Sequence, residues 1–371
     1  MLSTKRSKGI IGFILLAIIL IATIQSFSWY RFLTTPIIPI GKQLHFIFLP
    51  GASVKDLAKE LNQQNYLRKP YRLVILSLVT GAIYHLKFGE YLFQGGITPW
   101  QLLKQIVSGQ VVPHHIRIIE GWTFAQMLHA ISRAPYLNHQ LRGLSSAEVM
   151  FKLGHANQDP EGIFFPATYR YVMGMTDEEL LKIALETMNR KLTNAWNKRN
   201  MDLPYQDPYQ ALIVASMIEK ETHLTSEKPI IAGVILNRIA KHMYLQIDPT
   251  VIYGLGSKYT GMITLADLHS LSPYNTYKYK GLPPTPIALP SMTSIRAALH
   301  PQLTNALYYV ATGKGGHYFS ENLKQHYAAI KKYRLYLASI LRKETLPLIR
   351  SQSFSSCWYL PKNFQFICAK K

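Results

Sequence analysis

The chain has 371 residues, of which 48% are hydrophobic and only 16% are charged, so it can bury a sizeable core in one to three domains. Its 41 lysine and arginine residues outnumber its 20 aspartate and glutamate residues, and the net charge of +21 favours an anionic partner. Nucleic acid is the first candidate for a basic chain, but the basic residues are spread without a dense run, so we expect no nucleic-acid partner.

The N-terminus predicts a membrane anchor. Residues 1–8 are basic, and residues 9–30 carry no charge and are long enough to span a bilayer as a helix. The basic flank predicts a cytoplasmic N-terminus, and Trp29 and Tyr30 fit the aromatic belt at the far interface. A cleaved signal peptide is the alternative, but its apolar core is usually shorter, and residues 22–24 make a poor cleavage site.

Residues 31–110 predict a linker and a small module. Residues 31–43 contain two prolines and read as an extended linker. Residues 44–110 then follow strand-like and helix-like patterns in the order β-α-α-β-α, with Ser53 and Thr98 as helix caps. A small unit of this kind is more often a binding or positioning module than a catalytic one.

Residues 111–343 predict a larger mixed domain, which makes the fold class α+β. Strand patterns cover 112–119 and 307–312, and helix patterns cover 176–194 and 323–342. Another helix begins near Thr123, and one that carries Ile231 and Ile235 is expected to be capped by Thr225 or Ser226. Residues 272–290 form a long loop rich in proline and tyrosine, and loops of that length are usually functional or disordered.

The tail, residues 344–371, holds Cys357 and Cys368, the two cysteines of the chain. They could close a small loop in an oxidising compartment. A structural zinc site would need histidines near them, and none is close in the sequence, so we expect neither a metal nor a cofactor.

The central stretch is a predicted helix that begins at Asp207 and Pro208, a typical cap followed by a first-turn proline. Residues 211–218 carry no charge, which predicts a buried helix. Glu219 and Glu221 then follow at its end, and a buried helix that finishes in two carboxylates calls for an explanation.

Helical geometry separates these two carboxylates. At about 100° per residue, Glu221 shares a stripe with Val214, Met217 and Ile218, whereas Glu219 faces the opposite side. Desolvation beside these bulky groups would raise the pKa of Glu221, as a general acid for a glycosidic oxygen requires. The alternative is an ordinary helix-end carboxylate that pairs with Lys220 or Arg238.

The chain carries several long motifs, which are Ala215–Thr222, Ala232–Arg238, Leu245–Gly254, Tyr274–Tyr277, Gly281–Pro284 and Gly313–His317. In their order and spacing the chain resembles the YceG-like family of endolytic murein (peptidoglycan) transglycosylases. The resemblance runs from the anchor to about residue 340.

The resemblance implies a single-pass inner-membrane protein with a LysM-like module at 44–110 and a periplasmic catalytic domain at 111–343 with a lysozyme-like catalytic helix. Such an enzyme cleaves the β-1,4 bond after N-acetylmuramic acid and leaves 1,6-anhydro ends, with one glutamate as general acid and then base. The pair Glu221-Thr222 matches the Glu-Ser pair of goose-type lysozymes better than Glu219-Lys220 does. The implied partners are peptidoglycan glycan strands and the inner membrane, and peptidoglycan synthases of elongation or division are further candidates.

The resemblance also suggests residues that hold sugars, although an aspartate before proline is also a common turn former and the tyrosines could be packing residues. Two positions depart from the family pattern: Ala167 stands where Asp is common, which leaves an acidic helper on that loop in doubt, and Ile247 where Thr is usual. The candidate substrate-binding residues are Gln246, Asp248, Tyr253, Tyr274, Asn275 and Tyr277.

Two other functions stay open from the sequence. A muramidase that uses water would need a second carboxylate, for which Asp248 and Glu219 are the candidates. A non-catalytic peptidoglycan-binding or septal scaffold protein would not need Glu221 at all.

Overall fold

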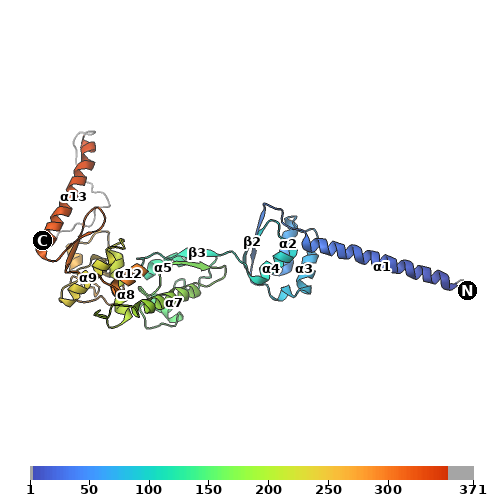
Figure 1. Ribbon diagram of the computed structural model, residues 1–371, viewed down its shortest axis with the longest axis horizontal. Helices are drawn as coiled ribbons and strands as arrows, with labels where there is room; N and C mark the ends of the chain where they lie inside the picture. The colour runs from blue at the N-terminus through green and yellow to red at the C-terminus, as the bar shows by residue number, and fades with distance from the viewer. Residues whose placement is uncertain (1–2, 350–371) are drawn as a thin grey trace. The chain divides into compact units, whose positions relative to one another are not determined.

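The computed structural model describes the backbone of residues 3–349 and the side chains of residues 12–340 (Figure 1). The chain folds into two compact units. Unit 1 holds the chain up to His115 together with Tyr136–Asn138 and Arg170–Met175, and unit 2 holds the rest of the described chain. Helices and short antiparallel strand pairs occur together, so the predicted α+β class is confirmed. Cys357 and Cys368 lie outside the described residues.

The predicted N-terminal helix is present as α1 (Ser3–Thr34), and its segment Gly12–Thr34 has a mean hydropathy of 2.0, long and apolar enough to cross a membrane. The end of α1 packs against the rest of unit 1. Phe32 and Leu33 pack against the core of that unit. Arg72 donates hydrogen bonds to the carbonyl oxygen of Ser28 (3.1 Å) and to its Oγ (2.8 Å).

The small module has the predicted order β-α-α-β-α. Its two strands pair in antiparallel fashion with Gln43 opposite Gln94, and its three helices bury their apolar faces in one core with them. Both predicted caps are confirmed, because Ser53 and Thr98 directly precede helices. The elements are β1 (Gln43–Phe48), α2 (Val54–Gln63), α3 (Pro70–Val79), β2 (Gly89–Gln94) and α4 (Pro99–Ser108).

The structure revises the predicted linker at 31–43. Residues 35–42 have no regular structure, as their prolines suggest, but Ile38 is fully buried in the core of the module. The Ile37 N–H donates to the carbonyl of Ile97 (2.9 Å), and the Gly96 N–H donates to that of Ile38 (2.8 Å). The apolar side chains between the prolines therefore make this segment part of the module.

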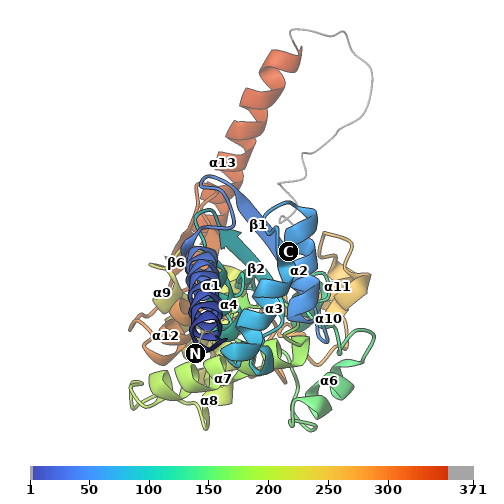
Figure 2. The same cartoon turned by 90° about the vertical axis from the view of Figure 1, so that its right-hand side faces the viewer.

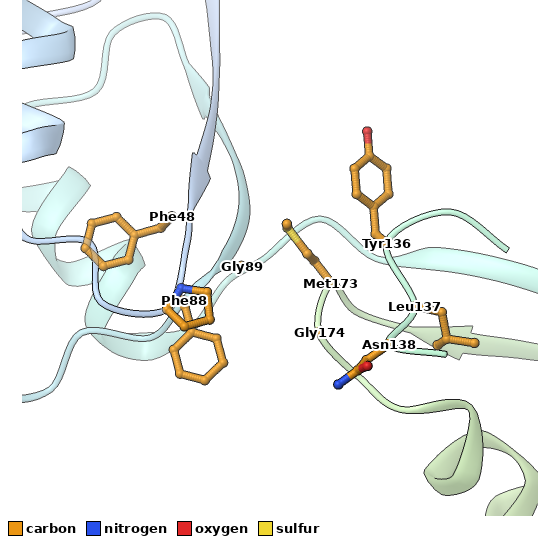
Figure 3. Close-up of a pocket in the computed structure, with 9 residues that line it drawn as sticks. Phe48, Phe88, Gly89, Tyr136, Leu137, Asn138, Met173 and Gly174 are labelled. Carbon is orange, nitrogen blue, oxygen red and sulfur yellow. The ribbon is translucent and has the colours of Figure 1, made fainter. Parts of the chain in front are cut away.

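Unit 1 also contains a pocket lined by the side chains of Phe48, Phe88, Tyr136, Leu137 and Met173, among others (Figure 3). None of its nine lining residues is acidic or basic. The pocket therefore offers no general acid for glycosidic cleavage.

The remaining described chain is mainly helical. Strands β3 (His114–Arg117) and β4 (Thr168–Tyr171) pair, as do β5 (Tyr308–Ala311) and β6 (His317–Ser320). The predicted long loop is confirmed, because no helix or strand lies between α11 and α12. The helices are α5 (Phe124–Ile131), α6 (Ser146–Lys152), α7 (Asp177–Trp196), α8 (Pro208–Glu221), α9 (Lys228–Ala240), α10 (Asp248–Leu255), α11 (Leu265–Leu268), α12 (Met292–Leu299) and α13 (Leu323–Ile349).

Helix α8 is the centre of unit 2. Its residues 211–219 are all buried, and it packs against α7, α9, α10 and α12. The predicted cap is confirmed, since Asp207 Oδ1 accepts a hydrogen bond from the Gln210 N–H (2.9 Å). The cap predicted for α9 was wrong by one or two residues, because α9 begins after Glu227.

The close approach between α9 and the chain after α12 gives a first prediction. A Cβ added at Gly233 would lie 2.4 Å from the backbone oxygen of Gln302. Alanine favours a helix over glycine by about 1 kcal/mol. We nevertheless expect Gly233→Ala to destabilise the fold by roughly 1–3 kcal/mol, because a backbone atom cannot yield as a side chain can. Denaturant unfolding measures this, and equal or greater stability would contradict the packing described here.

Candidate active site

The two carboxylates at the end of α8 have different environments. Glu219 is only 5% exposed, and its Oε2 accepts hydrogen bonds from Lys228 Nζ (3.0 Å), from the Ser291 N–H (3.0 Å) and from Ser294 Oγ. Burial alone would raise the pKa of Glu219, but the hydrogen bonds from Ser291 and Ser294 and the charge of Lys228 lower it below its ordinary value. Glu219 is therefore an ionised structural group.

Glu221 is the last residue of α8 and is half-buried. The expected order of burial is thus reversed, because Glu219 faces polar partners from α9 and α12 that the helical stripe did not reveal. Tyr309 of β5 donates a hydrogen bond to the Glu221 carboxylate. The Glu221 carboxylate also interacts with the positive charge of Arg238 on α9 and with the phenol of Tyr277 in the long loop.

Arg238 fixes the segment that carries two of the predicted sugar-binding residues. Arg238 is 7% exposed, and its guanidinium donates to the carbonyl oxygens of Leu245 (2.8 Å) and Leu307 (2.6 Å). It also donates to Gln246 Oε1 (3.3 Å). Arg238 therefore adds positive charge beside Glu221 and also orders the backbone before α10.

The predicted residues Asp248 and Tyr277 lie together, since the Tyr277 hydroxyl donates a hydrogen bond to Asp248 Oδ1. Burial and the charge of Asp248 raise the pKa of Tyr277, so its hydroxyl keeps its proton. Tyr277 interacts electrostatically with Glu221, and Asp248 interacts electrostatically with Tyr309. Of the predicted residues, Tyr277 thus interacts with Glu221, whereas Asp248 and Gln246 are linked to it through Tyr277, Tyr309 and Arg238.

Asn275 requires a correction. It was predicted to bind substrate, but it is 0% exposed, and its Nδ2 donates to the carbonyl oxygens of Leu268 (3.0 Å) and Ser270 (2.9 Å). Its Oδ1 accepts a hydrogen bond from the Tyr277 N–H (3.0 Å). Asn275 therefore shapes the loop and holds Tyr277 in place.

Tyr253 and Tyr274 gather around a carboxylate that sequence reasoning missed. Their rings meet edge to face at 4.8 Å, and the Tyr253 hydroxyl donates to Glu161 Oε2 (3.1 Å). Glu161 is 4% exposed and also accepts a hydrogen bond from the Phe124 N–H (3.1 Å) at the start of α5. Burial raises the pKa of Glu161 to about 7. Its one sequence signal was an acidic residue at the head of an apolar, aromatic run.

A second carboxylate that sequence reasoning missed, Glu227, contacts the residue after Glu221. Glu227 Oε1 accepts a hydrogen bond from the His317 N–H (2.7 Å), and its Oε2 pairs with His317 Nδ1 (2.7 Å) and accepts from Thr222 Oγ1 (3.2 Å). The His317 ring in turn meets the Tyr309 ring edge to face at 5.5 Å. One carboxylate therefore steadies both the residue after Glu221 and the tyrosine that donates to it.

The glycine before His317 is required by this arrangement. Gly316 has a φ of +87°, and a Cβ there would lie 2.5 Å from Glu227 Oε1. Within the Gly313–His317 motif, Gly316 thus lets the backbone approach a carboxylate. Within residues 12–340, no three His, Cys, Asp or Glu side chains form a group that could hold a metal ion.

Comparison with known proteins agrees with the resemblance. The model of the YceG-like family matches residues 47–332. The endolytic murein transglycosylase of Bacillus subtilis (strain 168) is 40% identical over 174 residues, which are 47% of this chain and 48% of that protein. The enzyme of the same name from Streptococcus pneumoniae serotype 2 is 26% identical over 340 residues, 80% of this chain and 60% of that protein.

The chain thus spans about half the length of the curated relatives it matches. A solved structure of a YceG-like protein from Listeria monocytogenes is 27% identical, with a TM-score of 0.48, and the match covers 77% of this chain and 99% of that one.

The raised pKa of Glu161 predicts that the stability of the fold depends on pH. The folded chain keeps this proton up to about pH 7, whereas the unfolded chain loses it near the ordinary value of 4.5. The stability linked to this group is therefore fully present below pH 4.5 and is lost as the pH rises to about 7, on the order of 3 kcal/mol in all. Urea unfolding between pH 5 and 8 should show this slope, and Glu161→Gln should flatten it. An equal slope in both proteins would contradict the assignment.

Proposed function

The chain belongs to the YceG-like family, and from this premise we propose that it is a membrane-anchored endolytic lytic transglycosylase of peptidoglycan. It cleaves the β-1,4 bond between N-acetylmuramic acid and N-acetylglucosamine within nascent glycan strands and so terminates them during cell wall biogenesis. The observation that carries the proposal is the contrast at the end of α8. Glu219 is occupied by Lys228, Ser291 and Ser294, whereas Glu221 is partly exposed beside polar side chains from three other elements.

In the proposed reaction Glu221 first acts as a general acid. Its proton passes to the glycosidic oxygen as the bond from that oxygen to muramyl C1 breaks, and the N-acetylglucosamine side leaves as an alcohol. The muramyl 6-hydroxyl then bonds to C1, and the Glu221 carboxylate takes its proton. The 1,6-anhydro ring closes without consuming water, so a second carboxylate is not needed to activate one.

The neighbouring side chains have supporting roles in this proposal. Gln246, Asp248 and Tyr277 offer hydrogen-bonding groups to the sugar next to the cleaved bond, and Arg238 and Tyr309 orient the acid. Tyr253 and Tyr274 present an aromatic pair, supported by Glu161, that suits the faces of sugar rings.

The proposed location follows from α1. Its apolar segment would hold the protein in the inner membrane as a single-pass anchor, with the basic N-terminus in the cytoplasm and the catalytic unit in the periplasm. The β-α-α-β-α module is proposed to be LysM-like and to bind glycan strands, and α8 to be the lysozyme-like catalytic helix. Peptidoglycan synthases are candidate partners.

The decisive test is the mass of the products from purified glycan strands. We expect the wild-type chain to release ends lighter by one water, that is, anhydromuramyl ends, and Glu221→Gln to be at least about 100-fold slower. A soluble form without the anchor should begin at Thr35 and not at residue 43, where the predicted linker ends, because Ile38 belongs to the core of the module.

Glu219→Gln is the matched control two residues away. It removes a buried ion pair, so its activity loss should follow its loss of folded protein. Reducing muramyl ends would show hydrolysis, and equal cleavage by wild type and folded Glu221→Gln would remove Glu221 from the mechanism. Folded wild-type protein that cleaves nothing would favour the alternative of a non-catalytic peptidoglycan-binding or septal scaffold protein.

Tyr309 gives a further prediction. Its hydrogen bond stabilises the ionised carboxylate of Glu221, so Tyr309→Phe should shift the basic limb of the kcat/KM profile upward by roughly one pH unit. Tyr308→Phe is the control, because Tyr308 directly precedes Tyr309 in β5 and the substitution keeps its ring, which stacks on His326 at 5.0 Å and lies under the Arg238 guanidinium at 5.1 Å. An unshifted profile in Tyr309→Phe would show that the phenol does not set the ionisation of the acid.

A further inference from the structure

The solvent-facing side of α3 is apolar along its whole length. Tyr71, Ile75, Leu78 and Val79 are 54%, 40%, 52% and 80% exposed, and their spacing places them on one face of the helix. Tyr84, just beyond the helix, is 81% exposed. The exposed face of a helix in a soluble domain normally carries polar and charged residues, so this face is expected to be covered by something.

The same helix contacts the anchor. The Arg72 guanidinium on α3 bonds to Ser28 and lies over the ring of Trp29 at 5.4 Å. In both views α3 lies at the end of the module where α1 joins it (Figure 1, Figure 2). Ser28 is six residues before the end of the apolar segment Gly12–Thr34, which is about 9 Å along a helix. A bilayer that covers the whole segment would therefore reach the level of α3.

The charges around this face suit anionic lipid. Residues 61–89, which contain α3, include no acidic residue and three exposed basic ones, Arg68, Lys69 and Lys87, besides the buried Arg72. Residues 28–42, which join the anchor to the module, include Arg31 and Lys42 and likewise no acidic residue. Each basic side chain near an anionic membrane surface adds about 1 kcal/mol of attraction.

We propose that the apolar face of α3 lies in the membrane, at the boundary between headgroups and acyl chains of the leaflet from which α1 emerges. The inference rests on the membrane anchoring in the proposed function. A helix of this kind lies in the plane of the interface with its apolar side about 5–10 Å deep, which matches the depth at which Arg72 meets α1. The module is then held against the membrane by α1 and α3 together.

The test places a nitroxide on α3 in the full chain. A Cys357→Ser, Cys368→Ser background carries Leu78→Cys, and the labelled protein is reconstituted in liposomes of phosphatidylcholine and phosphatidylglycerol. The collision rates with oxygen and with a water-soluble nickel chelate report whether the label is in lipid or in water. We expect the oxygen-to-nickel ratio at position 78 to be several-fold higher than at Ile47→Cys, an exposed apolar position on β1 of the same module.

Leu20→Cys, within α1, tests the premise separately. A lipid-like ratio at position 20 with a water-like ratio at position 78 would overturn the proposal and leave the anchor standing. Low access of both reagents to position 78 would show that another protein surface, such as a second copy of the chain, covers α3, and would also overturn it. A water-like ratio at both positions would refute the anchor together with the proposal, whereas the glycan-cleavage products test the enzyme activity independently.

Discussion

The ion pair between Glu219 and Lys228 joins the three helices on which the candidate site depends. Both side chains are about 5% exposed, and Ser291 and Ser294 from the start of α12 complete the hydrogen bonding of the carboxylate. Two charges so deeply buried stabilise a fold only when their hydrogen bonds are well satisfied, and removal of one partner typically costs 3–5 kcal/mol. The pair therefore fixes the end of α8 relative to α9 and α12, and Glu221 is only two residues further along.

Two carboxylates at this spacing are forced into different surroundings. A separation of two residues turns the helix by about 200°, so the groups that satisfy Glu219 cannot also reach Glu221. The protein uses one acid to hold its core and leaves the other beside side chains that can change protonation or accept a ligand. Enzymes with two carboxyl groups commonly divide their roles through such differences in environment. Loss of activity on substitution of Glu219 would consequently say little about chemistry unless folding were measured with it.

The local parts of this arrangement were predictable from sequence. Asp207 before a proline marked the start of α8, and alternating patterns gave the order of the module, because caps and periodicity depend on neighbours in the chain. The partners of Glu219 and Glu221 were not predictable in this way. Ser291 and Tyr309 lie 70 to 90 residues away, and helical periodicity shows which residues share a face but not which polar groups that face meets. The burial of Ile38 between two prolines and that of Asn275 in the tyrosine loop were not predicted, for the same reason.

The long-range contacts also explain why the family motifs occur where they do. Gly316 allows the backbone to reach Glu227, and Glu227 in turn holds Thr222 next to Glu221. Arg238, from the motif on α9, orders the backbone that carries Gln246 and Asp248. These motifs thus contribute either a group that interacts with Glu221 or a group that positions one. Because these contacts connect α8, α9, the turn before α10 and the β5–β6 hairpin, we expect a change at Gly316, Glu227 or Arg238 to alter the surroundings of the same carboxylate.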